Sequence, residues 1–270
     1  MKKLLTSRRK FMRRSALAVA GFPFIARGQF MFSDPALGSL LNKRRAAAGV
    51  DMTGITHRWY LDEAVNDTRL DSIGSAHLAD NNSVAQAAGV ISSAAQFTAA
   101  SSKYLSSGDI ADLNPGSSNF AMAYWVKLTD NAADYGTIGK TENAVETLDW
   151  FAQIEHGSAD KAILYIFDAD SNAYFVKSDT FGAISSGSWH FVVCGREGSN
   201  LKLSVNAGAF DTSDVTGITV RNSGTGFYLG CNNPSGAFMN GSMDEVYWWP
   251  SMFPSQAIIE ALYNGGSGAR

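Results

Sequence analysis

The chain has 270 residues, of which 45% are hydrophobic, so it can bury a sizeable core. Glycine is plentiful (26 residues), and long charged helical stretches are missing, which favours short strands joined by turns. The net charge of −3 hides a split. Eight of the 22 basic residues lie in the first 28 positions, which hold no acid, and the remainder carries 14 bases against 25 acids, about −11. An acidic body repels phosphate backbones, which excludes nucleic acid as a partner.

Residues 1–28 are predicted to be an export signal. Ser7–Arg13 (SRRKFMR) resembles the twin-arginine motif, with Arg8 and Arg9 as the defining pair. An apolar stretch follows, from Ala16 to Ile25, which is too short for a permanent membrane span. Ala26–Gly28 supplies small residues for cleavage. We therefore expect an exported bacterial protein whose contact with the membrane is only through this signal; retention of the signal as an uncleaved anchor remains an alternative.

Residues 29–55 are interpreted as a linker and residues 56–270 as the folded domain. Within the domain, apolar and polar residues alternate at Phe120–Leu128, Trp189–Cys194 and Leu201–Val205, the period of strands. Both faces of Trp189–Cys194 are apolar, which predicts a central strand. Ser255 can cap a short C-terminal helix that ends at Gly265 and Gly266 and packs on the edge of the sandwich. The predicted fold is all-β, a two-sheet antiparallel sandwich or jelly roll.

The two cysteines and one acidic segment each allow two interpretations. Cys194 and Cys231 are the only cysteines, and a buried free thiol and a disulfide are both compatible with export. Asp168–Asn172 (DADSN) has the first oxygen ligands of a calcium loop, but Ala173 replaces the glycine that such a loop needs. A plain hairpin turn between 163–167 and 174–177 is the favoured interpretation.

A series of motifs resembles the laminin-G-like branch of the concanavalin A-like lectin/glucanase superfamily. The resemblance covers roughly residues 57–266 and is carried by the order of its motifs: RWYLDE from Arg58, LDSIG from Leu70, AYWVK from Ala123, WHFVV from Trp189, LKLSVN from Leu201, FYLG from Phe227, NGSMDEV from Asn240 and IEALYNGG from Ile259. It implies a jelly roll, which agrees with the strand pattern. It also implies a structural Ca²⁺ near the rim, with Asp71 and Asp244 as the candidate ligands.

The same superfamily contains glucanases, so Asp244 and Glu245 are weighed as a catalytic pair. A retaining glycosidase needs two carboxyl groups that face one cleft. Neighbours on a regular strand point to opposite faces, so alternation places Asp244 with Val246 and Trp248, and Glu245 with Met243 and Tyr247. We therefore predict no catalytic residues, and a buried Asp244 bonded to the backbone of a loop. The four histidines are scattered and form no metal-ligand spacing.

The leading hypothesis is an exported, non-catalytic binding module for carbohydrate or for an extracellular protein. Sugar binding uses exposed aromatic rings flanked by amide groups. The candidate residues near loops are Tyr135, Trp150, Tyr174, Asn232, Asn233, Phe238 and Asn240. The alternatives are a structural or adhesive component of a cell envelope or appendage, and a divergent glycosidase.

Overall fold

The computed structural model describes residues 49–142 and 147–270. The predicted export signal, including Arg8 and Arg9, and most of the predicted linker lie outside these residues. None of the helices in the described part of the chain has the length and hydropathy that a membrane span requires.

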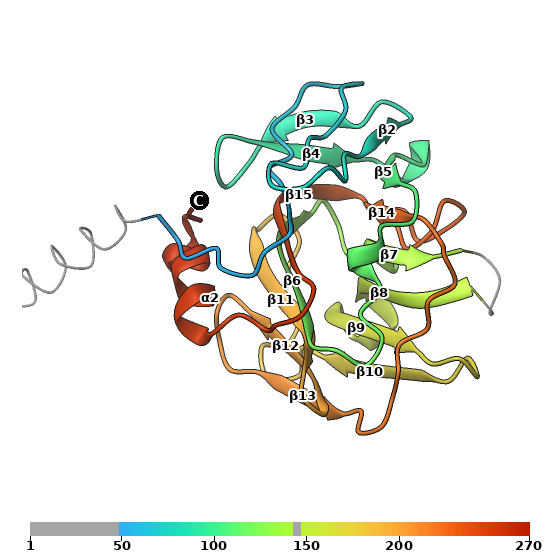
Figure 1. Ribbon diagram of the computed structural model, residues 1–270. Coiled ribbons are helices and arrows are strands. Elements are labelled where there is room, and N and C mark those ends of the chain that lie inside the picture. The colour runs from blue at the N-terminus through green and yellow to red at the C-terminus, as the bar shows by residue number, and fades with distance from the viewer. Residues whose placement is uncertain (1–48, 143–146) are drawn as a thin grey trace, which may run out of the picture. The chain divides into compact units, whose positions relative to one another are not determined.

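In the described residues, fifteen strands form two antiparallel sheets that face one another (Figure 1). The eight-stranded sheet has the order β13 (Asp211–Asp214), β12 (Asn200–Val205), β11 (His190–Glu197), β6 (Phe120–Leu128), β15 (Gly241–Trp249), β4 (Ser93–Phe97) and β3 (Ala85–Ala88), with β1 (His57–Trp59) paired to β15. The seven-stranded sheet has the order β10 (Ala173–Lys177), β9 (Lys161–Phe167), β8 (Leu148–Glu155), β7 (Tyr135–Thr141), β14 (Phe227–Leu229), β5 (Tyr104–Ser107) and β2 (Ala79–Asn81). The predicted sandwich is confirmed.

The main core lies between the two sheets, where alternate residues of each strand meet. Trp150 of one sheet stacks on Trp248 of the other, with ring centroids 5.1 Å apart, and Trp59 lies beside Phe227. The predicted strands at 120–128, 189–194 and 201–205 correspond to β6, β11 and β12, and β11 lies between the other two as expected for a central strand. Cys194 and Cys231 are both buried and unpaired, so the chain has two free thiols.

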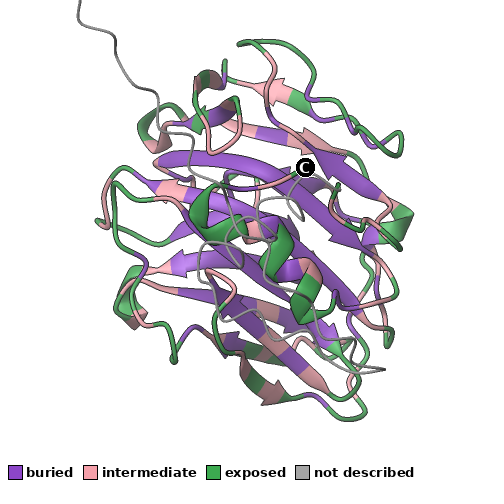
Figure 2. Cartoon of the chain, turned by 90° about the vertical axis from the view of Figure 1, so that its left-hand side faces the viewer, coloured by how far each residue is buried: buried purple, intermediate pink, exposed green. Residues whose placement is uncertain are grey.

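A second apolar cluster covers the outer side of the eight-stranded sheet. Helix α2 (Gln256–Tyr263) is capped by Ser255, whose Oγ accepts a hydrogen bond from the amide of Ile258. Ile259 and Leu262 pack with Trp125, Phe191 and Trp249. Figure 2 shows the helix lying in front of buried strands, so it covers the middle of the sheet rather than the predicted edge. The predicted left-handed stop at Gly265 and Gly266 is present, with φ 61 and 94, and it begins one residue earlier, at Asn264.

Candidate functional site

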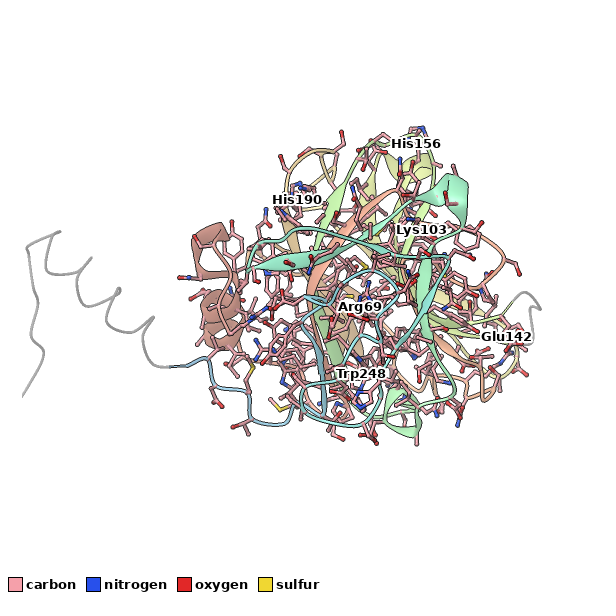
Figure 3. All side chains as sticks on the ribbon, turned by 90° about the horizontal axis from the view of Figure 1, so that it is seen from above. Arg69, Lys103, Glu142, His156, His190 and Trp248 are labelled. Carbon is pink, nitrogen blue, oxygen red and sulfur yellow. The ribbon has the colours of Figure 1, made fainter. Side chains whose placement is uncertain are left out.

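The outer face of the seven-stranded sheet carries one row of residues in continuous register. Each residue of the row is the pairing partner of the next, from β10 to β2: Phe175, Tyr165, Phe151, Gly139, Tyr228, Ser106 and Ala79. Residues paired in an antiparallel sheet point to the same side. Because their chain neighbours Val176, Leu164 and Ala152 are buried in the core, the row faces outward. His156 directly follows β8, and Glu142 directly follows β7 (both are labelled in Figure 3). Because these two strands are antiparallel, the two residues lie at opposite ends of this face.

Four rings at the β8–β10 end of this row form what we name the aromatic strip: Phe151, Tyr165, Phe167 and Phe175. The ring centroids of Phe151 and Tyr165 are 5.0 Å apart, and those of Tyr165 and Phe175 are 5.4 Å apart. Phe167 lies 5.8 Å from Phe151. Phe175 is 43% exposed and Phe151 and Tyr165 are half-buried, so the strip presents a connected aromatic surface that crosses three strands.

A polar network runs along one side of the aromatic strip. Glu155 accepts hydrogen bonds from the Tyr165 hydroxyl (3.0 Å), from Gln153 Nε2 (3.3 Å) and from Ser158. Lys177 Nζ lies 3.8 Å from the same carboxylate and donates to Ser158 Oγ. Burial, the hydrogen bond to Glu155 and the charge of Glu155 raise the pKa of Tyr165 to about 12. Tyr165 therefore stays protonated, and carboxylate, amide, hydroxyl and ammonium groups all border the rings.

The chain after β14 crosses the middle of this face over two glycines. A Cβ at Gly136 would meet the Asn232 amide nitrogen at 2.2 Å, and one at Gly139 would meet the Asn232 carbonyl oxygen at 2.2 Å, so only glycine lets the segment lie this close. Asn232 Nδ2 donates to Gln153 Oε1 at 2.7 Å, which joins it to the polar network. Beyond Asn232, the rings of Tyr104, Tyr228 and Phe238 form a second group, with centroids 6.0 and 6.1 Å apart.

The structure separates the ligand-contact residues predicted from the sequence. Asn232 and Phe238 lie over the outer face of the seven-stranded sheet, where Phe238 is half-buried and Asn232 is only 7% exposed. Trp150 and Tyr135 are 0% and 4% exposed and face the core. The expectation that their rings are exposed to a ligand was wrong. Tyr174 packs against the core and its hydroxyl bonds Asp168.

The two remaining predicted amides are engaged in loops. Asn240 Nδ2 donates to Asp130, which also accepts from the Tyr135 hydroxyl. Asn233 accepts from the Ser235 amide in a turn. Whether Asn232, Asn233, Phe238 or Asn240 touches a ligand stays a prediction.

Sequence reasoning missed the residues that form the strip and its polar border. Phe151, Gln153 and Glu155 recur every second residue in β8, as do Tyr165 and Phe167 in β9 and Phe175 and Lys177 in β10. The period of two is visible in the sequence, but the alternate positions of the same strands are apolar too. The pattern therefore does not tell which of the two sets faces outward.

The predicted alternation at Asp244 and Glu245 was wrong. The register of β15 against β6 shifts between Asp244 and Tyr247, and Glu245 has φ 50, so one extra residue forms a bulge. Asp244 pairs with Trp125, and Glu245 bonds the Tyr247 hydroxyl; both aromatic residues belong to the outer cluster. The two carboxyl groups thus share the outer side, whereas Val246 and Trp248 face the core. Both acids are 0% exposed, so no open cleft contains them.

The predicted bonding of Asp244 is confirmed. Its Oδ2 accepts from the backbone amides of Val90 and Ile91, at 2.7 and 3.0 Å. Burial, together with the charges of Glu245 and Asp62, raises the pKa of Asp244 to about 7 against the effect of these amides.

Asp71 and Asp244, the predicted calcium ligands, both accept hydrogen bonds from backbone amides. The Asp71 carboxylate accepts hydrogen bonds from His57 Nδ1 and from the amides of Arg58, Ile73, Gly74 and Ala76, which occupy its oxygens. Asp71 and Asp244 share none of these donors. In residues 49–142 and 147–270, no group of three or more histidines, cysteines or acids is disposed to hold a metal ion. Asp168–Asn172 is the hairpin turn between β9 and β10, as predicted.

The arrangement is that of a lectin-type jelly roll, with one sheet covered by a helix and the other open and aromatic. Residues 99–259, more than half of the chain, match the Laminin_G_3 family of the concanavalin A-like lectin/glucanases superfamily. The chain therefore belongs to this family. No curated protein matches the chain.

Solved structures show the same fold at low sequence identity. The binding domain of Paraclostridial Mosquitocidal Protein 1 matches with a TM-score of 0.61 and 14% identity over 79% of this chain, and the botulinum neurotoxin serotype D binding domain with 0.61 and 14% over 78%. The chain spans about half (52%) of each of these domains. Domain 4 of AbnA, a GH43 extracellular arabinanase from Geobacillus stearothermophilus solved in complex with arabinotriose, matches with a TM-score of 0.58 and 17% identity over 77% of this chain and 97% of that domain.

Proposed function

We propose that this protein is an exported, non-catalytic carbohydrate-binding module and that the aromatic strip holds the sugar. The observation that carries the proposal is the in-register row Phe175–Tyr165–Phe151 on an open sheet face, bordered by the network of Glu155, Gln153 and Lys177. Aromatic rings contact the apolar faces of sugars, and polar side chains bond their hydroxyls. The lectin-type family and the arabinotriose-bound neighbour support this assignment.

The absence of catalysis is part of the proposal. Asp244 and Glu245 are fully buried and bonded within the protein, so they offer no accessible acid–nucleophile pair. Glu155, in the polar network beside the strip, bonds Tyr165, Gln153 and Ser158, as a positioning group would. The binding domains among the structural neighbours agree with this assignment.

The test is affinity electrophoresis of the full chain in gels containing soluble polysaccharides, followed by titration calorimetry with the best ligand. We expect retardation, and a loss of affinity of about tenfold or more in Phe175→Ala and Tyr165→Ala, because each removes a stacking ring. Phe181→Ala is the matched control, since Phe181 is 41% exposed but contacts His190 outside the strip. Unchanged retardation in both strip variants would refute the site, and the absence of retardation by any polysaccharide would refute the function.

Export rests on the SRRKFMR motif at Ser7–Arg13. Replacing Arg8 and Arg9 by lysine keeps the charge but removes the paired guanidinium groups. We expect the wild-type protein outside the cytoplasm and the double variant inside it, as judged by fractionation of expressing cells. Equal export of both proteins would contradict the twin-arginine route.

A further inference from the structure

An open groove of about 630 Å³ lies beside the aromatic strip, where the edges of the two sheets meet. β10 and β13 are edge strands of different sheets, and both lie at the lower end of the sandwich in Figure 1. The lining includes Phe175 and Lys177 of β10, and Asp211, Thr212 and Ser213 of β13. The groove is therefore built by both sheets.

Phe175 belongs both to the strip and to the groove. It is the first residue of the in-register row, next to Tyr165, and it forms part of the groove lining. At 43% exposure, it is also the most exposed ring of the strip. A chain-like ligand that lies across β8, β9 and β10 and passes Phe175 therefore enters the groove.

Both lysines of the groove lining are paired with acids. Lys161 Nζ lies 2.6 Å from Asp179 Oδ1, and Lys177 lies 3.8 Å from Glu155. The carboxylate of Asp211 accepts three hydrogen bonds from the amide and hydroxyl of Thr180. Both lysines of the lining thus already have an acid beside them, whereas the Asp179 side chain is 66% exposed and can accept more hydrogen bonds.

We propose that the groove is the second part of the sugar site and that the ligand is a linear, neutral oligosaccharide that continues from the strip into it. This inference rests on the proposed function. Hydroxyl groups both donate and accept, which suits a lining that offers carboxylates, ammonium groups and the hydroxyls of Ser158, Thr212 and Ser213. A carboxylated or sulfated glycan would need unbalanced cations and would meet a body whose net charge is about −11 beyond residue 28.

The experiment is titration calorimetry of the full chain with a length series of the neutral polysaccharide that retards it most. Wild-type affinity should rise with chain length until the ligand fills both parts of the site. In the double variant Asp179→Asn/Thr212→Ala, this gain should fall about tenfold, since two hydrogen-bonding groups are altered, while the shortest ligand that binds wild type keeps its affinity. The matched control is Asp67→Asn/Thr68→Ala, the same chemical change at exposed residues of another loop.

The outcomes separate the two proposals. Binding that is lost in Phe175→Ala but has the wild-type length dependence in the groove variant overturns the groove and leaves the strip. Tighter binding of an acidic glycan than of a neutral one of equal length, or a marked loss of affinity at high salt, overturns the neutral class. If no glycan of any length binds, both the proposed function and this inference fail. Melting of both double variants at the wild-type temperature, as expected for surface changes, excludes misfolding as the cause.

Discussion

Asp244 and Glu245 are adjacent in the chain, yet both carboxyl groups lie on the outer side of the eight-stranded sheet. The bulge at Glu245 inserts one residue, so the alternation of faces restarts after it. Arg270 then bridges two acids, with Nε on Glu245 Oε1 at 2.5 Å and Nη2 on Asp62 Oδ2 at 2.6 Å. The proposal that the protein is not catalytic therefore rests on the burial and pairing of these two acids. It does not rest on the expectation that their side chains point to opposite faces.

Glu245→Gln is expected to lower the free energy of unfolding by about 2–4 kcal/mol, because it leaves the buried Arg58 and the half-buried Arg270 without their partner. Glu245 bonds Arg58 Nη2 at 3.0 Å, the Tyr247 hydroxyl at 2.7 Å and Arg270, and its side chain is 0% exposed. Urea titration measures the change, with Glu260→Gln on the exposed side of α2 as control. A loss below about 1 kcal/mol would show that the pairs are dispensable. Hydrolysis of a β-glucan by wild type that this variant abolishes would contradict the non-catalytic assignment.

Asp244→Asn is expected to flatten the dependence of stability on pH. The folded pKa of about 7 lies above the ordinary value of 3.8, so the folded state keeps a proton that the unfolded chain releases between these values. Stability is therefore lost as pH rises from about 4 to about 7. The asparagine side chain does not titrate, so the variant does not lose stability in this way. Between about pH 4 and about pH 7, its free energy of unfolding should therefore rise by about 1–3 kcal/mol relative to wild type. Urea titrations at several pH values test this, with Asp170→Asn as control. A parallel decline in wild type and variant would show that Asp244 is ionised throughout.

Asp71→Ala is expected to lower stability by about 3 kcal/mol or more, equally with calcium and with chelator. Burial alone would raise the pKa of Asp71, but hydrogen bonds from His57 and from the amides of Gly74, Arg58 and Ile73 outweigh it and lower that pKa. Its contribution is thus present above the ordinary pKa near 4 and is lost as pH falls below it. Thermal melting with and without calcium measures both effects, with Asp67→Ala as control. A calcium-dependent rise in melting temperature that vanishes in Asp71→Ala would support the predicted calcium site instead.

The sequence was sufficient for the sandwich because its clearest strands alternate regularly. In β12, buried Leu201 and Leu203 flank half-buried Lys202, as the period of two requires. In α2, the Ser255 cap and the stripe of Ile259 and Leu262 specified a helix with one buried side. Helical periodicity shows that a helix has a buried side, but it does not show which part of a sheet that side covers. The position of α2, over the middle of the eight-stranded sheet, was therefore not predicted.

The candidate site could not be predicted in the same way, because its strands are apolar on both faces. Trp150 and Tyr174 were chosen, but they point into the core, while their chain neighbours Phe151 and Phe175 face outward. Each error is a shift of one residue, which reverses the face. The bulge at Glu245 caused the same error, since no local feature of MDEVY reveals the extra residue. Only the pairing of strands that are far apart in the chain determines which residues of each strand face the core.

Gly139→Ala tests whether the segment at Asn232 must lie directly on the open face. The added Cβ would come within 2.2 Å of the Asn232 carbonyl oxygen, a backbone atom that also accepts a hydrogen bond from Thr141. Backbone has to move, so we expect a loss of about 1–3 kcal/mol in stability and weaker glycan binding, as Asn232 pulls away from Gln153. Gly108→Ala is the matched control, because its Cβ would meet nothing within 4 Å and Gly108 lies outside the groove lining. Equal urea midpoints and equal affinities for the two variants would mean that the crossing segment yields freely and does not shape the site.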